Sequence, residues 1–136
     1  MSKVIKLKKG LDIKLKGEAE NLVKSIEKCD FYAVKPTDFR LLTPKLAVKA
    51  GDQVKAGDVL FIDKYRPEVK FTSPVSGTVE AVNRGERRKL LEVVVKADAQ
   101  IQYKDFGAAD VNKLSREEII EKLLDSGVWP MIKQRP

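Results

Sequence analysis

The sequence predicts a mainly β fold of the α+β class, with one helix near its carboxyl end. Two copies of Lys-Ala-Gly-Asp end at Asp52 and Asp58, and their glycines can adopt the positive φ that a tight turn requires. Short runs of β-branched and aromatic residues lie between these turns, which is typical of strands. The segment 115–118, Ser-Arg-Glu-Glu, matches a capping box and predicts the start of a helix.

Residues 1–30 are expected to form an extended arm or hairpin that packs on the β module. Apolar side chains alternate with polar ones in two short bursts there, at Ile5, Leu7, Leu11, Ile13 and Leu15. Residues 18–28 carry apolar side chains at a spacing compatible with a helix, whereas residues 31–34 are typical of a strand. Residues 35–44 follow as a proline-marked loop, which is either a connector or a contact loop.

Residues 31–105 are expected to form the β module itself. Residues 78–82 alternate apolar and polar side chains, and residues 90–95 are rich in valine, so both segments predict strands. The residues predicted to build the turns are Gly51, Asp52, Gly57, Asp58, Pro74 and Gly77.

Residues 106–136 are expected to form a helical tail that leads to a further domain absent from this chain. The helix begins at the capping box, its apolar face includes Ile120 and Leu124, and Gly127 ends it in the left-handed conformation. Trp129 follows the helix and is expected to be partly exposed, because the surface that would bury it belongs to the continuation.

Composition removes several classes of catalyst. The 136 residues contain no histidine and a single cysteine, Cys29, so a Cys/His zinc site, a four-thiolate iron–sulfur cluster and a His-based nucleophile cannot be assembled within the chain. No apolar run reaches the length of a transmembrane span. The net charge of +7 favours acidic partners in general. The densest basic cluster, residues 84–89, contains no aromatic residue to stack a base, so no nucleic-acid partner is expected.

The order of the turns resembles the barrel-sandwich hybrid of biotinyl and lipoyl carrier domains. In those carriers a lysine at an exposed hairpin tip holds the prosthetic group, and Lys64 of Asp63-Lys64 falls near the matching place. The methionines expected around a biotin site are absent. Residues 65–68 lengthen the hairpin beyond that of a lipoyl site, and Pro67 removes a backbone donor. Lys64 is therefore a weak candidate for a lipoyl attachment site.

Taken together, the chain resembles the amino-terminal region of NqrA, a peripheral component of the bacterial sodium-translocating NADH:quinone oxidoreductase, the Nqr complex. Five segments carry the resemblance in the same order along the chain: residues 5–12, 34–39, 43–54, 60–64 and 84–88. The segment 126–130, Ser-Gly-Val-Trp-Pro, is also similar.

The resemblance implies a position on the cytoplasmic side of the bacterial inner membrane. The complex oxidises NADH, reduces quinone and exports sodium, and it uses flavins and an iron–sulfur centre held by its other subunits. The partners implied are those subunits, the remainder of NqrA, and quinone in the full-length protein. This segment is expected to bind no cofactor or metal and to have no catalytic residue, because it has no histidine, one cysteine and no Gly-x-Gly-x-x-Gly motif after a strand. No family motif assigns a quinone contact to any of its positions.

Three other functions are compatible with these residues. The first is the similar module in the RnfC component of Rnf-type electron-transport complexes. The second is a lipoyl-type carrier that uses Lys64. The third is a basic RNA-associated β domain that uses residues 84–89, which otherwise form a solvated hairpin turn.

Overall fold

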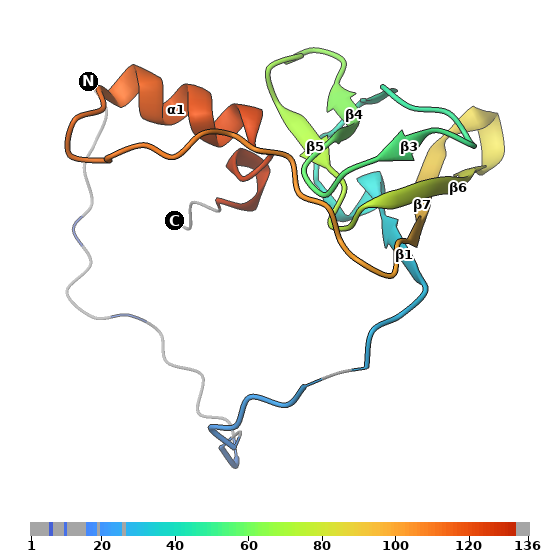
Figure 1. Cartoon of the computed structure of the whole chain (residues 1–136), viewed down its shortest axis with the longest axis horizontal. Helices are drawn as coiled ribbons and strands as arrows, with labels where there is room; N and C mark the ends of the chain where they lie inside the picture. The colour runs from blue at the N-terminus through green and yellow to red at the C-terminus, as the bar shows by residue number, and fades with distance from the viewer. Residues whose placement is uncertain (1–5, 7–9, 11–15, 19, 26, 133–136) are drawn as a thin grey trace.

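The computed structural model describes residues 6, 10, 16–18, 20–25 and 27–132, and it shows two small antiparallel sheets with a helix at their side (Figure 1). The strands are β1 (Phe31–Val34), β2 (Pro44–Leu46), β3 (Gln53–Val54), β4 (Val59–Asp63), β5 (Lys70–Thr72), β6 (Gly77–Arg84) and β7 (Leu90–Ala97). The helix is α1 (Arg116–Asp125), and 3-10 turns occur at η1 (Pro36–Asp38), η2 (Glu86–Arg88) and η3 (Trp129–Met131).

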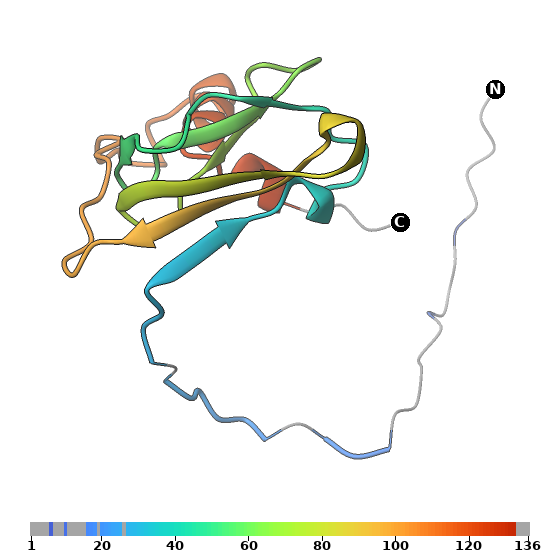
Figure 2. The ribbon, with the colours of Figure 1, turned by 90° about the vertical axis from the view of Figure 1, so that its right-hand side faces the viewer.

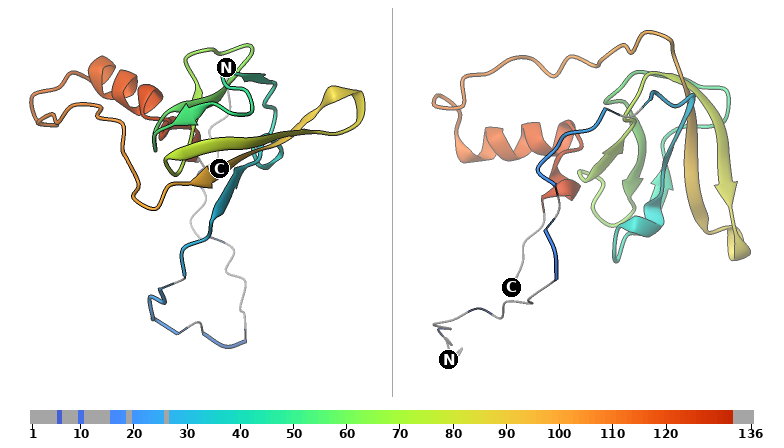
Figure 3. Two further views of the ribbon diagram at one scale, coloured as in Figure 1. Left: turned by 45° about the vertical axis from the view of Figure 1, so that its right-hand side comes forward. Right: turned by 90° about the horizontal axis from the view of Figure 1, so that it is seen from below.

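The first sheet has the strand order β1-β7-β6-β3, and the second has the order β2-β4-β5. The long β6–β7 hairpin forms the centre of the first sheet. In this hairpin Val79 lies opposite Val95, and Val82 lies opposite Val93. Two register shifts in this hairpin curl the sheet, since each bulge bends its strand. The views in Figures 2 and 3 show the second sheet lying across the curled hairpin, so that the two sheets enclose one interior.

The core lies between the two sheets. Phe61 stacks on Phe71 with ring centroids 4.9 Å apart, and Phe39 meets Phe71 edge-on at 4.6 Å. These aromatic contacts come from β4, β5 and the loop after η1, so they tie that loop to the second sheet. The buried apolar cluster consists of Val54, Leu60, Phe61, Phe71, Val75, Val79, Leu90, Val93 and Val95.

The two Lys-Ala-Gly-Asp copies fold into the same turn. Gly51 and Gly57 have φ of +92° and +98°, which confirms the positive φ predicted for both. In each copy the aspartate carboxylate accepts a hydrogen bond from the amide of the lysine three residues earlier, at 2.9 Å for Asp52 and 2.8 Å for Asp58. A side-chain acceptor on a local amide stabilises a turn. The aspartates therefore help to close these turns.

Residues 73–79 run antiparallel to these two turns. The amide of Gly51 donates to the carbonyl of Val79, and the amide of Gly57 donates to the carbonyl of Ser73, both at 2.8 Å. The amides of Val79 and Ser73 donate back to Asp52 and Asp58 at the same distance. Gly51 and Gly57 are six residues apart, and so are their hydrogen-bonding partners Val79 and Ser73. The spacing of the two turns therefore matches that of the segment that pairs with them.

Residues 74–77 lead from the end of β5 into β6, whose first residue is Gly77. Gly77 is buried at φ +154°, and a Cβ there would lie 1.9 Å from the carbonyl oxygen of Lys96. Pro74 lies exposed in the preceding bend. The hydroxyl of Ser76 is buried, donates to Asp98 and accepts from the amide of Gln102, each at 2.8 Å. Gly77 is therefore required because the β7 backbone passes through the space of a side chain.

Helix α1 begins at the predicted capping box. The Ser115 hydroxyl accepts from the amide of Glu118, and the Glu118 carboxylate accepts from the amide of Ser115 at 2.8 Å. Gly127, at φ +73°, follows the last turn and lies against Thr72 of β5. The apolar face of α1, including Ile120 and Leu124, is only half-buried, and Trp129 is 37% exposed, as expected.

The amino-terminal segment differs from one expectation. The helix-compatible spacing in residues 18–28 does not produce a helix in the described residues 18, 20–25, 27 and 28. Leu22 is 66% exposed and Val23 fully exposed, so no packing surface compensates the weak local propensity. The expected hairpin of residues 5–15 lies almost entirely outside the described residues. The described part of residues 16–30 runs away from the sheets (Figure 1). Among the described residues, no helix has both the length and the apolar character to cross a membrane.

Candidate functional site

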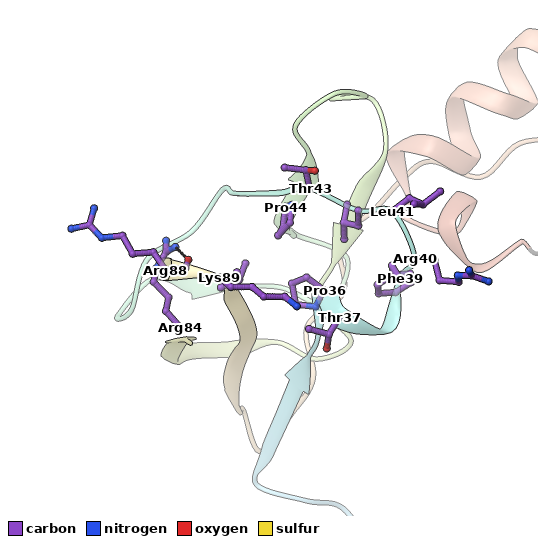
Figure 4. Close-up of a pocket in the computed structure, with 12 residues that line it drawn as sticks. Pro36, Thr37, Phe39, Arg40, Leu41, Thr43, Pro44, Arg84, Arg88 and Lys89 are labelled. Atoms are coloured by element: carbon purple, nitrogen blue, oxygen red, sulfur yellow. Dashed lines mark hydrogen bonds between the residues drawn. The ribbon is translucent and has the colours of Figure 1, made fainter. Parts of the chain in front are cut away.

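A pocket forms where the proline-marked loop faces the turn between β6 and β7. Its volume is about 520 Å³, which is within the range of about 300 to 1,000 Å³ typical of small-ligand sites. Figure 4 shows the side chains of both segments around it. We call it the basic pocket; it is lined by Pro36, Thr37, Phe39, Arg40, Leu41, Leu42, Thr43, Pro44, Arg84, Arg88, Lys89 and Leu90.

The lining divides into a cationic side and an apolar side. Arg84, Arg88 and Lys89 come from the hairpin turn, whereas the loop supplies the prolines, Leu41 and Leu42. The lining contains four cationic side chains, with Arg40 as the fourth, and no carboxylate. Within the part of the chain that the structure describes, none of these four forms an ion pair. The pocket therefore presents positive charge that the surrounding residues do not neutralise.

The backbone around the basic pocket is strained. Leu41, Arg87 and Arg88 are the non-glycine residues with positive φ among the described residues, at +62°, +52° and +61°. All three lie in the two segments that form the pocket walls. The Arg84 guanidinium donates a hydrogen bond of 3.0 Å to the carbonyl of Arg88, which fixes the shape of the turn. Left-handed non-glycine residues cost about 1 to 2 kcal/mol each, and such strain is concentrated at functional sites.

A second pocket lies on the other side of the proline-marked loop. Its volume is about 470 Å³. Phe39, Phe71 and Trp129 supply aromatic surface, and Asp63 and Arg66 supply a charged pair whose Oδ2 and Nε atoms are 3.1 Å apart. We call it the aromatic pocket; it is lined by Asp38, Phe39, Arg40, Leu42, Asp63, Arg66, Val69, Phe71, Trp129, Pro130 and Ile132.

Lys64, the weak lipoyl candidate, lies at the end of β4. Its amide donates to the carbonyl of Thr43 at 2.8 Å, and its ammonium group lies 5.8 Å from the centroid of the Tyr65 ring. The side chain is exposed, but five residues separate Asp63 from its hydrogen-bonded partner Val69. Lys64 therefore begins a wide loop and does not occupy the tip of a tight hairpin. Its modification stays a prediction.

Among the carboxylates of the described residues, two have lowered pKa values, and both belong to α1. The hydrogen bonds from Ser115 lower the pKa of Glu118 below its ordinary value. A hydrogen bond and the positive charge of Lys70 lower the pKa of Asp125, which joins the helix to β5. Both groups are exposed structural carboxylates, so neither is a candidate acid or base. Among the described residues, no three histidine, cysteine, aspartate or glutamate side chains gather as metal ligands.

The sequence located both walls of the basic pocket but not the pocket itself. Residues 35–44 and 84–89 were each recognisable, as a possible contact loop and a basic turn. About 40 residues separate them, and no local pattern indicates that they face each other. Arg40 and Leu41 were missed, because an isolated basic residue and an isolated leucine in a loop carry no periodic signal.

Comparison with known proteins identifies the module. The model of the family described as the NqrA N-terminal barrel-sandwich hybrid domain matches residues 5–98. The NqrA protein of the Na(+)-translocating NADH-quinone reductase from Yersinia pseudotuberculosis serotype O:1b is 40% identical over 135 residues, which cover 98% of this chain and 30% of that relative. Proteins of the same description from Hahella chejuensis and Haemophilus influenzae (strain PittEE) are each 38% identical with the same coverage. The chain thus spans about 30% of the length of these curated relatives.

Proposed function

We propose, because the chain belongs to the family of the NqrA N-terminal barrel-sandwich hybrid domain, that it acts as the amino-terminal module of NqrA in a sodium-translocating NADH-quinone reductase. The observation that carries the proposal is the match over nearly the whole chain to relatives of that description, at 38–40% identity. Its role there is to support assembly of the complex and quinone reduction. NADH oxidation and sodium export take place in the complex as a whole.

The module functions by binding neighbouring proteins of the complex. With no histidine and a single, exposed cysteine, its side chains offer few groups for proton transfer or redox chemistry near neutral pH. Its surface instead offers loops held on a rigid core, which is the usual arrangement of a contact surface. The β module of residues 31–105 binds neighbouring subunits, and residues 106–136 connect it to the remainder of NqrA. These contacts hold NqrA peripherally on the cytoplasmic side of the bacterial inner membrane.

Helix α1 supports the connecting role. Its apolar face is half-buried, and Val128, Met131 and Ile132 after it are 45%, 61% and 59% exposed. A group of exposed apolar side chains is typical of a surface that another domain covers. Asp125 and Gly127 hold the helix end against β5, so that surface has a fixed position relative to the β module.

The test exchanges the module within a complete complex. Residues 1–136 would replace the matching segment of the Yersinia pseudotuberculosis NqrA, and a second strain would carry NqrA without that segment. The complex is purified through a tag on one of its other proteins, and NADH-driven quinone reduction is measured. We expect the chimera to co-purify and turn over, and the deletion to lose NqrA from the complex. A deletion that assembles and reduces quinone at the normal rate would contradict the proposal.

A further inference from the structure

We propose that the basic pocket binds the phosphate group of an anionic ligand, and that its apolar wall contacts the rest of that ligand. This inference goes beyond the role in assembly, because it assigns a binding site and a ligand class to one surface of the module. The phosphate oxygens would contact Arg84, Arg88 and Lys89 from the hairpin turn. Leu41 lies on the loop across from these cations (Figure 4), and Leu42 lines the same apolar wall.

The two segments that form this pocket carry much of the net charge of the chain, and four of their six basic side chains line it. The segments 35–44 and 84–89 together hold six basic and two acidic side chains, a net charge of +4 out of +7 for the whole chain. The two acidic residues, Asp38 and Glu86, do not line the pocket. Placing several like charges around one cavity raises the local potential and favours a multiply charged anion. A phosphate group fits this better than a single carboxylate, and arginine binds it in a bidentate geometry.

The strained turn matches an anion site. Arg87 and Arg88 adopt left-handed φ values that glycine or asparagine would adopt at lower cost. The turn instead carries two arginines there, and the hydrogen bond from Arg84 to the Arg88 carbonyl holds it in shape. The Arg84 and Arg88 side chains are thereby presented from one rigid turn. The Arg84 guanidinium is already held in place by this hydrogen bond, so it loses little conformational entropy when it binds an anion.

The apolar wall narrows the class of ligand. Leu41 is 92% exposed at a strained position next to Arg40, so an apolar side chain faces solvent where a polar one would be less costly. The Phe39 ring packs edge-on against Phe71 and is not free to stack on a base. The pocket therefore offers cations and aliphatic surface, which suits an organic phosphate better than inorganic phosphate.

The test measures binding of three probes to the chain by amide chemical shifts at about 150 mM salt, where long-range attraction is screened. The probes are inorganic phosphate, 1-naphthyl phosphate and dihexanoylphosphatidic acid below its micellar concentration. We expect saturable shifts confined to residues 36–44 and 84–90, with at least one organic phosphate binding more tightly than inorganic phosphate. Tighter binding of the naphthyl compound assigns a soluble ligand, and tighter binding of the phosphatidic acid assigns a lipid headgroup.

Matched variants distinguish binding in the basic pocket from general electrostatic attraction to the positively charged surface. The double variant Arg88→Gln/Lys89→Gln should lower the affinity for the tighter organic phosphate by about tenfold or more, because it removes charge-assisted contacts. The control Lys55→Gln/Lys96→Gln removes the same charge from exposed positions outside the pocket and should change affinity by less than about twofold. Leu41→Asn relieves the strained φ and should weaken binding of the organic phosphate only.

Two results would overturn the inference. Equal losses in the two double variants, or shifts spread over lysines throughout the surface, would show non-specific attraction. Organic phosphates that bind no more tightly than inorganic phosphate, with Leu41→Asn neutral, would remove the apolar contact. Because all substituted residues are exposed, the amide spectrum of each variant should retain the positions of the core strands, which verifies that the fold is intact.

Discussion

Replacing Gly77 by alanine should cost far more stability than replacing Gly51 by alanine, although both glycines have positive φ. At Gly51, with φ of +92°, a Cβ would meet no atom within 4 Å. At Gly77, with φ of +154°, it would lie 1.9 Å from the carbonyl oxygen and 2.8 Å from the carbonyl carbon of Lys96. The first substitution tests conformational strain alone. The second adds a collision with backbone.

The expected losses of folding free energy follow from the strain at Gly51 and the collision at Gly77. A non-glycine residue forced to positive φ costs about 1 to 2 kcal/mol, so Gly51→Ala should destabilise by that amount. Ordinary carbon–oxygen contacts exceed about 3 Å, so Gly77→Ala must move β6 and β7 apart by more than about 1 Å. That movement breaks the pairing of Gly77 with Ala97 and exposes the end of the core. We expect a loss of about 3 kcal/mol or more, which is a large part of the stability of a small domain.

Urea unfolding followed by circular dichroism measures both losses in one experiment. With a slope of about 1 to 2 kcal/mol per molar urea, Gly51→Ala should lower the midpoint by roughly 1 M, and Gly77→Ala should leave little folded protein in water. Equal midpoints for the two variants would refute the reasoning, because the close approach of the β7 backbone at Gly77 would then not exist. A near-normal midpoint for Gly51→Ala would show instead that the first turn relaxes out of positive φ.

Three further predictions concern the turns, the helix and the tryptophan. Asp52→Ala should destabilise by about 1 kcal/mol because it removes the acceptor for the Lys49 amide, whereas Asp52→Asn should recover most of the loss through its amide oxygen, as measured by thermal melting. Lys70 lowers the pKa of Asp125, so this pair stabilises the helix contact above the ordinary aspartate pKa and loses that stabilisation as pH falls through the lowered value. The urea midpoint of Lys70→Met should therefore lie below that of the parent protein at about pH 6 and converge with it toward about pH 3, and a difference independent of pH would argue against the ion pair. Trp129 is the single tryptophan and is 37% exposed, so iodide should quench its fluorescence to an extent between that of free tryptophan and that of a buried residue; a blue-shifted, quencher-resistant emission would contradict that exposure.

The local features were predictable wherever the chemistry of a turn or cap decides the structure. The glycine and aspartate of each Lys-Ala-Gly-Asp copy determine its conformation through φ and one side-chain hydrogen bond, so the sequence alone predicted both turns. The capping box at Ser115 predicted the start of α1 for the same reason. The resemblance to biotinyl and lipoyl carrier domains then predicted the barrel-sandwich hybrid, which the family match confirms.

The features that depend on tertiary contacts were not predictable in this way. The apolar spacing around Leu22 indicated a helix, but spacing stabilises a helix only when a surface receives its apolar face. The basic pocket depends on the curl of the β6–β7 hairpin, which brings the turn at Arg88 opposite the loop at Leu41. That curl arises from register shifts near Val79 and Asn83, and no single residue in those segments marks them.

The loop that carries Phe39, Arg40 and Leu42 forms a wall shared by the two pockets, because these three residues line both the basic pocket and the aromatic pocket. If this loop moves toward one pocket, it enlarges the other. A shift of this loop toward Arg88 would widen the space around Trp129 and narrow the space beside Arg88, so ligands bound in the two pockets would change each other's affinity by the same factor. The edge-on contact of Phe39 with Phe71 anchors one end of this loop and limits how far it can shift.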